Sequence, residues 1–156
     1  MVQFATYCSP FGPIEIGHEN GKIVSIGRSS SPACHNPSAA SELANRQLQA
    51  YFEGRLKSFD LPLDLKGTPF QISVWTQLLE IPYGEVRSYG QIAAAIGKPG
   101  ASRAVGQAAN RNPLWIVIPC HRVVGSNAAL TGYAGGLDMK RALLELEKMH
   151  KYCPEA

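Results

Sequence analysis

The sequence predicts a mixed α+β protein in two parts, a small β-rich part followed by a helical part. Two observations carry this prediction. In the first 28 residues, short segments that alternate apolar and polar residues are separated by Gly-Pro and Asn-Gly pairs, which is typical of β-hairpins. From residue 68 on, apolar residues recur at helical spacing and the segments end at Gly or Pro. We therefore expect two domains, residues 1–66 and 67–156.

The first part is expected to hold three strands and one helix. The alternating segments are, in order, residues 4–7, 14–17 and 23–26. Asn20-Gly21 between the last two predicts a tight hairpin turn. Residues 38–53 carry an apolar stripe at helical spacing and stop at Gly54. Residues 64–68 form the expected linker.

The second part is expected to contain a helix-turn-helix. Residues 68–81 are amphipathic, and a Ser-x-x-Gln capping box at Ser88 opens a short helix over 89–96. A tight Gly-containing turn then leads to a helix over 101–110, and two short helices in this relation indicate a helix-turn-helix. The β-branched run 116–118 predicts a strand that would add a wing.

The helix over 101–110 is unusual for a DNA-reading helix. Half of its residues are Ala or Gly, and its one long cation is Arg103. Helices that read the major groove carry several long polar side chains, whereas small residues with one Arg suit close approach to a minor groove. The alternative is that the small residues merely let the helix pack tightly on its neighbours.

The net charge of +3 is unevenly distributed. Residues 1–67 are neutral and so is the stretch after residue 127, so the excess lies in residues 68–127. A local basic face suits a polyanion such as nucleic acid, although scattered surface Arg residues would produce the same count.

The motif Pro119-Cys120-His121-Arg122 carries the chemistry. Cationic neighbours lower the pKa of a thiol, and the thiolate is the nucleophile. Because Pro119 ends a strand ladder, we expect Cys120 at a strand-to-turn or strand-to-helix corner, partly exposed. The alternative is a buried structural cysteine.

Composition excludes several other classes. No apolar run approaches the roughly 18 residues of a membrane span, and the N-terminal residues do not resemble a secretory signal. The four cysteines, Cys8, Cys34, Cys120 and Cys153, have no paired spacing. We expect free thiols in a reducing compartment and a cytoplasmic location.

Five ordered blocks between residues 68 and 147 resemble the O6-alkylguanine-DNA alkyltransferases. They are Pro82-Tyr83-Gly84-Glu85, Ser88-Tyr89-Gly90, Arg103-Ala104-Val105-Gly106 with Asn112-Pro113, Pro119-Cys120-His121-Arg122-Val123 and Gly132-Tyr133-Ala134-Gly135-Gly136-Leu137. Tyr51-Phe52-Glu53-Gly54 and Phe59-Asp60-Leu61-Pro62 match more weakly. The resemblance implies a ribonuclease H-like N-terminal domain and a C-terminal winged helix-turn-helix DNA-binding domain.

The resemblance also implies roles for individual residues. Cys120 would accept the alkyl group, His121 would take the thiol proton through a water, and Glu147 would orient that imidazole. Asn112 would hold the turn beneath the thiol. Tyr89 would rotate the phosphate 3′ to the lesion and help to protonate the leaving base. The competing interpretation of Glu147 is a solvated partner of Lys151 at i+4.

Two further groups follow from the resemblance. The DNA-binding residues would be Arg103, which fills the gap left by a flipped nucleotide, together with Tyr89, Ser102, Ala109 and Arg111. The substrate pocket would be lined by Tyr133, Ala134, Gly135, Val123 and Trp75. Ala128 stands where the family commonly has Gly, which would stiffen the loop and alter which alkyl groups fit.

The implied activity is irreversible transfer of an alkyl group from O6 of guanine, and from O4 of thymine, in duplex DNA to Cys120. The base would flip through the minor groove, and each molecule would react once without a cofactor. We expect a monomer, on the nucleoid in a prokaryote or in the nucleus in a eukaryote. A thiol hydrolase and a non-catalytic lesion-binding or regulatory helix-turn-helix protein are the alternatives.

A structural zinc site in the first domain is a further hypothesis, because some relatives bind zinc there. The candidate ligands are Cys8, His18, Cys34 and His35, but their spacings match no standard zinc pattern. We therefore expect no metal.

Overall fold

The computed structural model describes residues 1–29, 35–125, 133 and 135–154. The chain divides into two compact units, which are described separately. The first holds Met1–Leu65 and the last residues from Cys153 on, and the second holds Lys66–Tyr152. No helix in the described part of the chain is long and apolar enough to cross a membrane.

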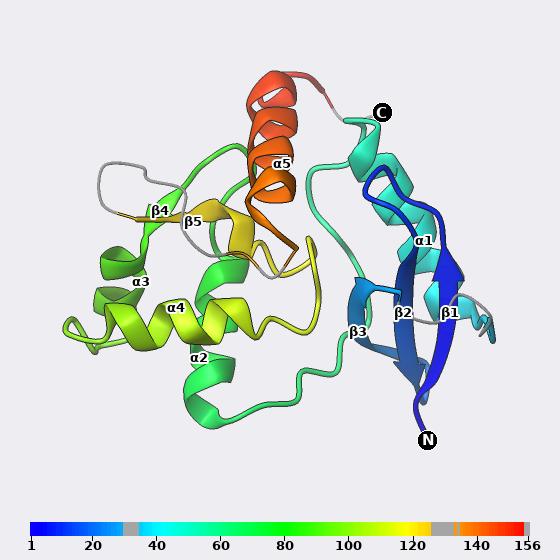
Figure 1. Ribbon diagram of the computed structural model, residues 1–156, viewed down its shortest axis with the longest axis horizontal. Coiled ribbons are helices and arrows are strands. Elements are labelled where there is room, and N and C mark those ends of the chain that lie inside the picture. Colours follow the sequence, from blue (N-terminus) through cyan, green and yellow to red (C-terminus); the bar gives the residue numbers. More distant parts are fainter. Residues whose placement is uncertain (30–34, 126–132, 134, 155–156) are drawn as a thin grey trace. The chain divides into compact units, whose positions relative to one another are not determined.

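The first unit is an antiparallel sheet covered by one helix (Figure 1). Its strands are β1 (Gln3–Tyr7), β2 (Ile14–Glu19) and β3 (Lys22–Arg28), in the order β1-β2-β3. Asn20 and Gly21 both have positive φ, at 53° and 76°. These are the dihedral signs of the tight hairpin turn that the Asn-Gly pair predicts, so this prediction is confirmed.

Cross-strand register explains which face of this sheet is buried. Ala5 pairs with Ile16, and Ile16 pairs with Ile26, so all three side chains lie on one face and all are buried. Helix α1 (Ala39–Phe52) packs on β2 and β3. It contributes the fully buried Leu48 and Tyr51 to the core.

The candidate zinc ligands of this unit make other bonds. His18 Nε2 lies 2.7 Å from the carbonyl oxygen of Asn36, and His35 Nδ1 accepts a hydrogen bond from the backbone N–H of Thr6 at 3.1 Å. Cys34 lies outside the described residues. Within those residues, no group of three or more His, Cys, Asp or Glu side chains could hold a metal ion.

The second unit is built around three short helices. They are α2 (Pro69–Leu79), α3 (Tyr89–Ala95) and α4 (Ser102–Asn110), and each packs on the other two. Capping boxes open two of them, Thr68 with Gln71 and Ser88 with Gln91. The capping box therefore starts α3 at the predicted residue, and the expected helix-turn-helix pair α3–α4 is present.

The expected strand over residues 116–118 is wrong. These residues form turns, and Ile116 has a φ of +73°, a strained value for a β-branched residue. The run is apolar because it lies in a stretch, residues 114–124, in which every residue is buried. The parallel pairing in this unit instead joins β4 (Arg87–Ser88) to β5 (Val123–Val124).

Helix α5 (Leu137–His150) packs on the 3₁₀ turn η1 (Cys120–Arg122). Its buried residues, Met139, Lys140, Leu143 and Glu147, form one stripe at helical spacing. Two charged residues therefore lie on the buried face of this helix. This stripe and η1 together build the candidate site.

Candidate active site

Cys120 is the first residue of η1 and is only 4% exposed. The expected partly exposed position at a strand end is therefore wrong, because the chain reaches Cys120 through buried turns instead of a strand. The cysteine is nevertheless surrounded by polar groups, which distinguishes it from a cysteine that merely fills a core.

The side chain of Asn112 makes three hydrogen bonds around the turn that leads to Cys120. Its Nδ2 donates to the Cys120 sulfur at 3.1 Å and to the carbonyl of Ile118 at 2.8 Å. Its Oδ1 accepts from the backbone N–H of Leu114 at 2.8 Å. One buried amide therefore spans both ends of the turn and places a hydrogen-bond donor against the sulfur.

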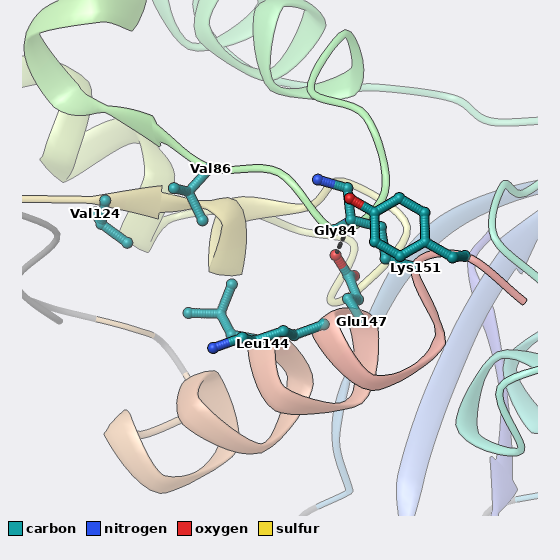
Figure 2. Close-up of a pocket in the computed structure, with 8 residues that line it drawn as sticks. Gly84, Val86, Val124, Leu144, Glu147 and Lys151 are labelled. Atoms are coloured by element: carbon teal, nitrogen blue, oxygen red, sulfur yellow. Dashed lines mark hydrogen bonds between the residues drawn. The ribbon is translucent and has the colours of Figure 1, made fainter.

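Glu147 is fully buried, and both of its carboxylate oxygens are occupied. Oε2 accepts from His121 Nε2 at 2.6 Å and from Arg122 Nη2 at 3.0 Å, while Oε1 accepts from Arg122 Nε at 2.8 Å. The backbone N–H of Gly84 donates to Oε1 at 3.1 Å, as Figure 2 shows. Because Glu147 faces the interior, it is not the solvated partner of Lys151 at i+4.

The state of Glu147 follows from these contacts. Burial by itself raises the pKa of this carboxyl group. The hydrogen bonds from His121 and Arg122 and the positive charge of Arg122 outweigh burial and hold the pKa well below its ordinary value. Glu147 is therefore a carboxylate at neutral pH.

Arg122 was expected beside the thiol from its place in the sequence, but its partner Glu147 is visible only in the structure. The guanidinium makes two hydrogen bonds to Glu147, and Nη1 donates to the carbonyl of Ile81 at 2.7 Å. It also lies 5.6 Å from the ring centroid of Tyr83. Its planar fork neutralises a buried carboxylate, which would otherwise be costly to bury.

His121 is fully buried against this carboxylate. Burial lowers the pKa of the imidazole, while the hydrogen bond and charge of Glu147 act in the opposite direction. With Glu147 ionised, Nε2 carries the proton that is donated to it. The neutral ring then has its acceptor lone pair on Nδ1, which makes Nδ1 the basic atom.

Burial also governs the resting state of Cys120. It raises the pKa of the thiol to about 11, against the hydrogen bond from Asn112 and the positive charge of Lys140, which lower it. The resting protein therefore holds a neutral thiol beside a neutral imidazole. Nucleophilic chemistry here requires proton transfer as part of the reaction.

Lys140 and Tyr133 complete the surroundings of the thiol. Lys140 has no exposed surface, and its charge acts on both Cys120 and His121. Burial raises the pKa of Tyr133 well above its ordinary value, and Cys120 adds to this effect. Lys140 was not among the residues expected at the site. Its helical spacing from Leu143 and Glu147 already places it on the same face of the helix as these two residues.

The expected DNA-binding residues differ in exposure. Arg103 and Arg111, within and just after α4, are exposed, and Ser102 and Tyr89 are half-buried. Ala109 is 3% exposed, so its side chain faces the helical core and does not fit a DNA contact. It lies on the side of α4 that packs against its neighbours, whereas Arg103 lies on the exposed side.

The expected pocket residues are not all placed together. Val123 is buried in β5 directly after η1. Trp75 lies in the helical core and donates from Nε1 to the carbonyl of Ala108 at 2.9 Å. A Cβ on Gly135 would lie 2.9 Å from the Tyr133 ring, so this glycine permits their close approach. Ala134 and Ala128 lie outside the described residues.

A cavity of about 630 Å³ lies on another side of Glu147. Figure 2 shows Val86, Val124 and Leu144 projecting toward it, with Glu147 at one end. Gly84 and Lys151 lie at that same end. Cys120 is not among the described residues that line this cavity.

A buried thiol, an imidazole and a carboxylate on a two-unit fold with a helix-turn-helix define a DNA-binding protein with cysteine chemistry. Residues 2–65 match the family described as 6-O-methylguanine DNA methyltransferase, ribonuclease-like domain. Residues 69–149 match 6-O-methylguanine DNA methyltransferase, DNA binding domain.

Individual relatives agree. The methylated-DNA–protein-cysteine methyltransferase of Mycobacterium tuberculosis is 48% identical over 155 residues, covering 95% of this chain and 93% of the relative. The protein of the same name from Methanosarcina acetivorans is 53% identical over 152 residues, covering 92% and 97%. A crystal structure of Mycobacterium tuberculosis OGT in complex with DNA superposes with a TM-score of 0.87 at 49% identity, covering 95% of this chain and 94% of that one.

The chain belongs to the methylated-DNA–protein-cysteine methyltransferase family. It is thus a DNA-binding enzyme of DNA repair that transfers an alkyl group, and its mixed α+β fold in two parts is that of the family.

Proposed function

We propose that this protein transfers an alkyl group from O6 of guanine in duplex DNA to the sulfur of Cys120. The observation that supports this most is the buried line of hydrogen bonds around Glu147. His121 and Arg122 both bind this carboxylate, and Asn112 binds the adjacent thiol. This arrangement supplies a nucleophile, a base and a group that orients the base.

The first step is removal of the thiol proton. The proton passes from Cys120 through a water to Nδ1 of His121, and the imidazolium is stabilised by Glu147. Because Glu147 is already ionised and held by Arg122, it keeps its own protonation state, and the positive imidazolium meets a fixed negative charge. This offsets part of the cost of forming two charges in a buried site.

The thiolate then attacks the alkyl carbon. The new S–C bond forms as the C–O6 bond breaks, and the electron pair stays on the guanine, which takes up a proton. Tyr89, at the start of α3, is the proposed donor of that proton. The product is a thioether, and no group in the site can expel it, so each molecule reacts once.

The target carbon is inaccessible inside a duplex, so the nucleotide must leave the stack at a cost of a few kcal/mol. Arg103 is exposed on α4 and is the residue proposed to occupy the vacated space from the minor groove. Ser102 and Arg111 are proposed to contact the DNA backbone. The same chemistry extends to O4 of thymine, and the protein is proposed to act as a monomer.

A labelled-transfer experiment tests this proposal. The protein is incubated with a duplex that carries O6-methylguanine with a radiolabelled methyl group, and the label on protein is counted. We expect one label per molecule, located on Cys120 and absent in Cys120→Ser. Repeated turnover would instead indicate a hydrolase. Binding without transfer would indicate a lesion-binding protein, and either result would overturn the proposal.

A further inference from the structure

Lys140 is a buried amine at the centre of the site. It lies on α5 and has no exposed surface. Lysine is among the residues least often fully buried, because its ammonium group loses strong hydration there. A lysine near the surface extends its flexible stem until the ammonium reaches water. Full burial of this side chain therefore calls for groups in the interior that favour a positive charge.

Two neighbouring groups interact with the charge of Lys140. Its Nζ lies 5.8 Å from the ring centroid of Tyr89, the first residue of α3, in a cation–π arrangement. Helix α5, which carries Lys140, packs on η1, which carries Cys120, and the charge of each group acts on the pKa of the other. The charge of Lys140 therefore acts on the proposed nucleophile, and its Nζ lies over the ring of the residue proposed to protonate the leaving base.

We propose that Lys140 is a positioning residue for alkyl transfer: its buried ammonium group stabilises the thiolate of Cys120 and holds the ring of Tyr89 at the start of α3. The proposal rests on the function proposed above and adds a residue to it. Lys140 does not itself give up a proton in the reaction.

The charges balance through the step. The thiol proton goes to His121, where Glu147 meets the new positive charge, and the thiolate is left facing the Lys140 ammonium. The imidazolium is thus paired with the Glu147 carboxylate, and the thiolate with the Lys140 ammonium. When the S–C bond forms, the sulfur becomes neutral and the ammonium remains protonated. In a poorly hydrated site, a fixed cation favours the anionic nucleophile far more than it would in water.

This role has a pH limit. Burial lowers the pKa of Lys140 to about 8, and Cys120 opposes this shift. Among the described titratable or charged groups around this site, His121 and Arg122 lie on η1, Tyr89 on α3, Tyr133 before α5 and Glu147 on α5. The ammonium form is present at neutral pH. It is lost as the pH rises above about 8, and its support of the thiolate is lost with it.

The test measures the ionisation of the Cys120 thiol directly. In a background with Cys8, Cys34 and Cys153 changed to Ser, the thiolate is titrated by its ultraviolet absorbance and by its rate of reaction with iodoacetamide. Lys140→Met removes the charge, Lys140→Arg keeps it, and Lys148→Met is the matched control, because Lys148 is exposed on the same helix. Thermal unfolding checks that each variant is folded.

We expect Lys140→Met to shift the titration of Cys120 to higher pH by about one unit, which corresponds to roughly a tenfold lower thiolate population at neutral pH. Reaction with free O6-benzylguanine, which bypasses DNA binding, should slow by the same factor. Lys148→Met should match the parent. A folded Lys140→Met protein with an unchanged Cys120 titration would overturn the proposal.

Lys140→Arg keeps the proposal testable if the Met variant does not fold. A guanidinium does not titrate in this range, so the inflection near pH 8 in the parent's rate should disappear in the Arg variant; its persistence would overturn the proposal. Because iodoacetamide reports the thiol whether or not DNA is repaired, failure of this idea is distinct from failure of labelled transfer in the parent protein.

Discussion

Nε2 of His121 lies 2.6 Å from Oε2 of Glu147, and both side chains are fully buried. The two residues are 26 positions apart in the sequence, and only the packing of α5 on η1 brings them together. This contact determines which ring nitrogen of His121 carries the proton, and with it the direction in which the imidazole can act as a base.

Glu147→Gln should impair both alkyl transfer and stability. The amide no longer fixes the imidazole tautomer, and it leaves the buried Arg122 without a counter-charge. We expect transfer to free O6-benzylguanine to slow at least tenfold. The free energy of unfolding in urea should fall by about 3–5 kcal/mol, as when one partner of a buried ion pair is removed. Glu145→Gln, exposed on the same helix, should change neither. Equal behaviour of the two variants would contradict this assignment.

The protein should lose stability progressively in acid. The pKa of His121 is lowered from 6.5 on folding, so below about pH 6.5 the unfolded chain binds the proton more readily and stability falls. The pKa of Glu147 is also lowered, from 4.5, so its contribution is present above about pH 4.5 and is lost as the pH falls further. Urea unfolding across this range checks the prediction, and a flat profile between neutral pH and pH 4 would refute the His121 part.

Asn112→Ala should destabilise the turn that leads to Cys120. It leaves the buried N–H of Leu114 without its acceptor, at a cost of roughly 1–3 kcal/mol. It also removes one of two hydrogen bonds to the Ile118 carbonyl, which keeps the bond from the Cys120 N–H. Loss of the donor to sulfur should also raise the pKa of Cys120. Asn110→Ala, at an exposed position at the end of α4, is the control. A variant as stable as this control would show that the turn does not depend on the amide.

Arg103→Ala should weaken repair of a duplex more than reaction with free O6-benzylguanine. The exposed guanidinium is proposed to occupy the space of a flipped nucleotide, and a free base requires no flipping. Single-turnover rates on both substrates measure the difference, with Arg141→Ala, an exposed arginine on α5, as control. Losses of equal size on both substrates would remove Arg103 from this role.

Gly106→Ala separates the two explanations for the small residues of α4. A Cβ at this position would lie 3.7 Å from the Tyr89 ring, an ordinary contact, so packing does not require glycine. We expect the helix to gain about 0.5–1 kcal/mol in the free energy of unfolding, whereas affinity for duplex DNA should fall because the added methyl group obstructs close approach. Unfolding in urea and a DNA titration give the two values. A destabilised variant would show that packing selected the glycine.

Much of the local structure could be predicted from sequence because it depends on neighbouring residues. Asn20-Gly21 turns the backbone within two residues, and the Ser88–Gln91 capping box satisfies backbone N–H groups within one helical turn. Both effects can therefore be predicted without knowing the rest of the fold. The ordered motifs around Cys120 and Tyr133 likewise identified the family.

The tertiary structure determined which residues are buried and how burial changes their charge states. The run 116–118 resembles a strand because it is β-branched, but it is apolar because it is enclosed on all sides, and a buried turn and a buried strand have the same composition. The depth of Cys120, the two hydrogen bonds from Arg122 to Glu147 and the enclosure of Lys140 arise where α5 meets η1. Charge states at that contact follow from desolvation and from partners distant in sequence. The sequence by itself therefore determined most of the elements and indicated Cys120 as the candidate nucleophile, and the packing of those elements determined the charge state of Cys120.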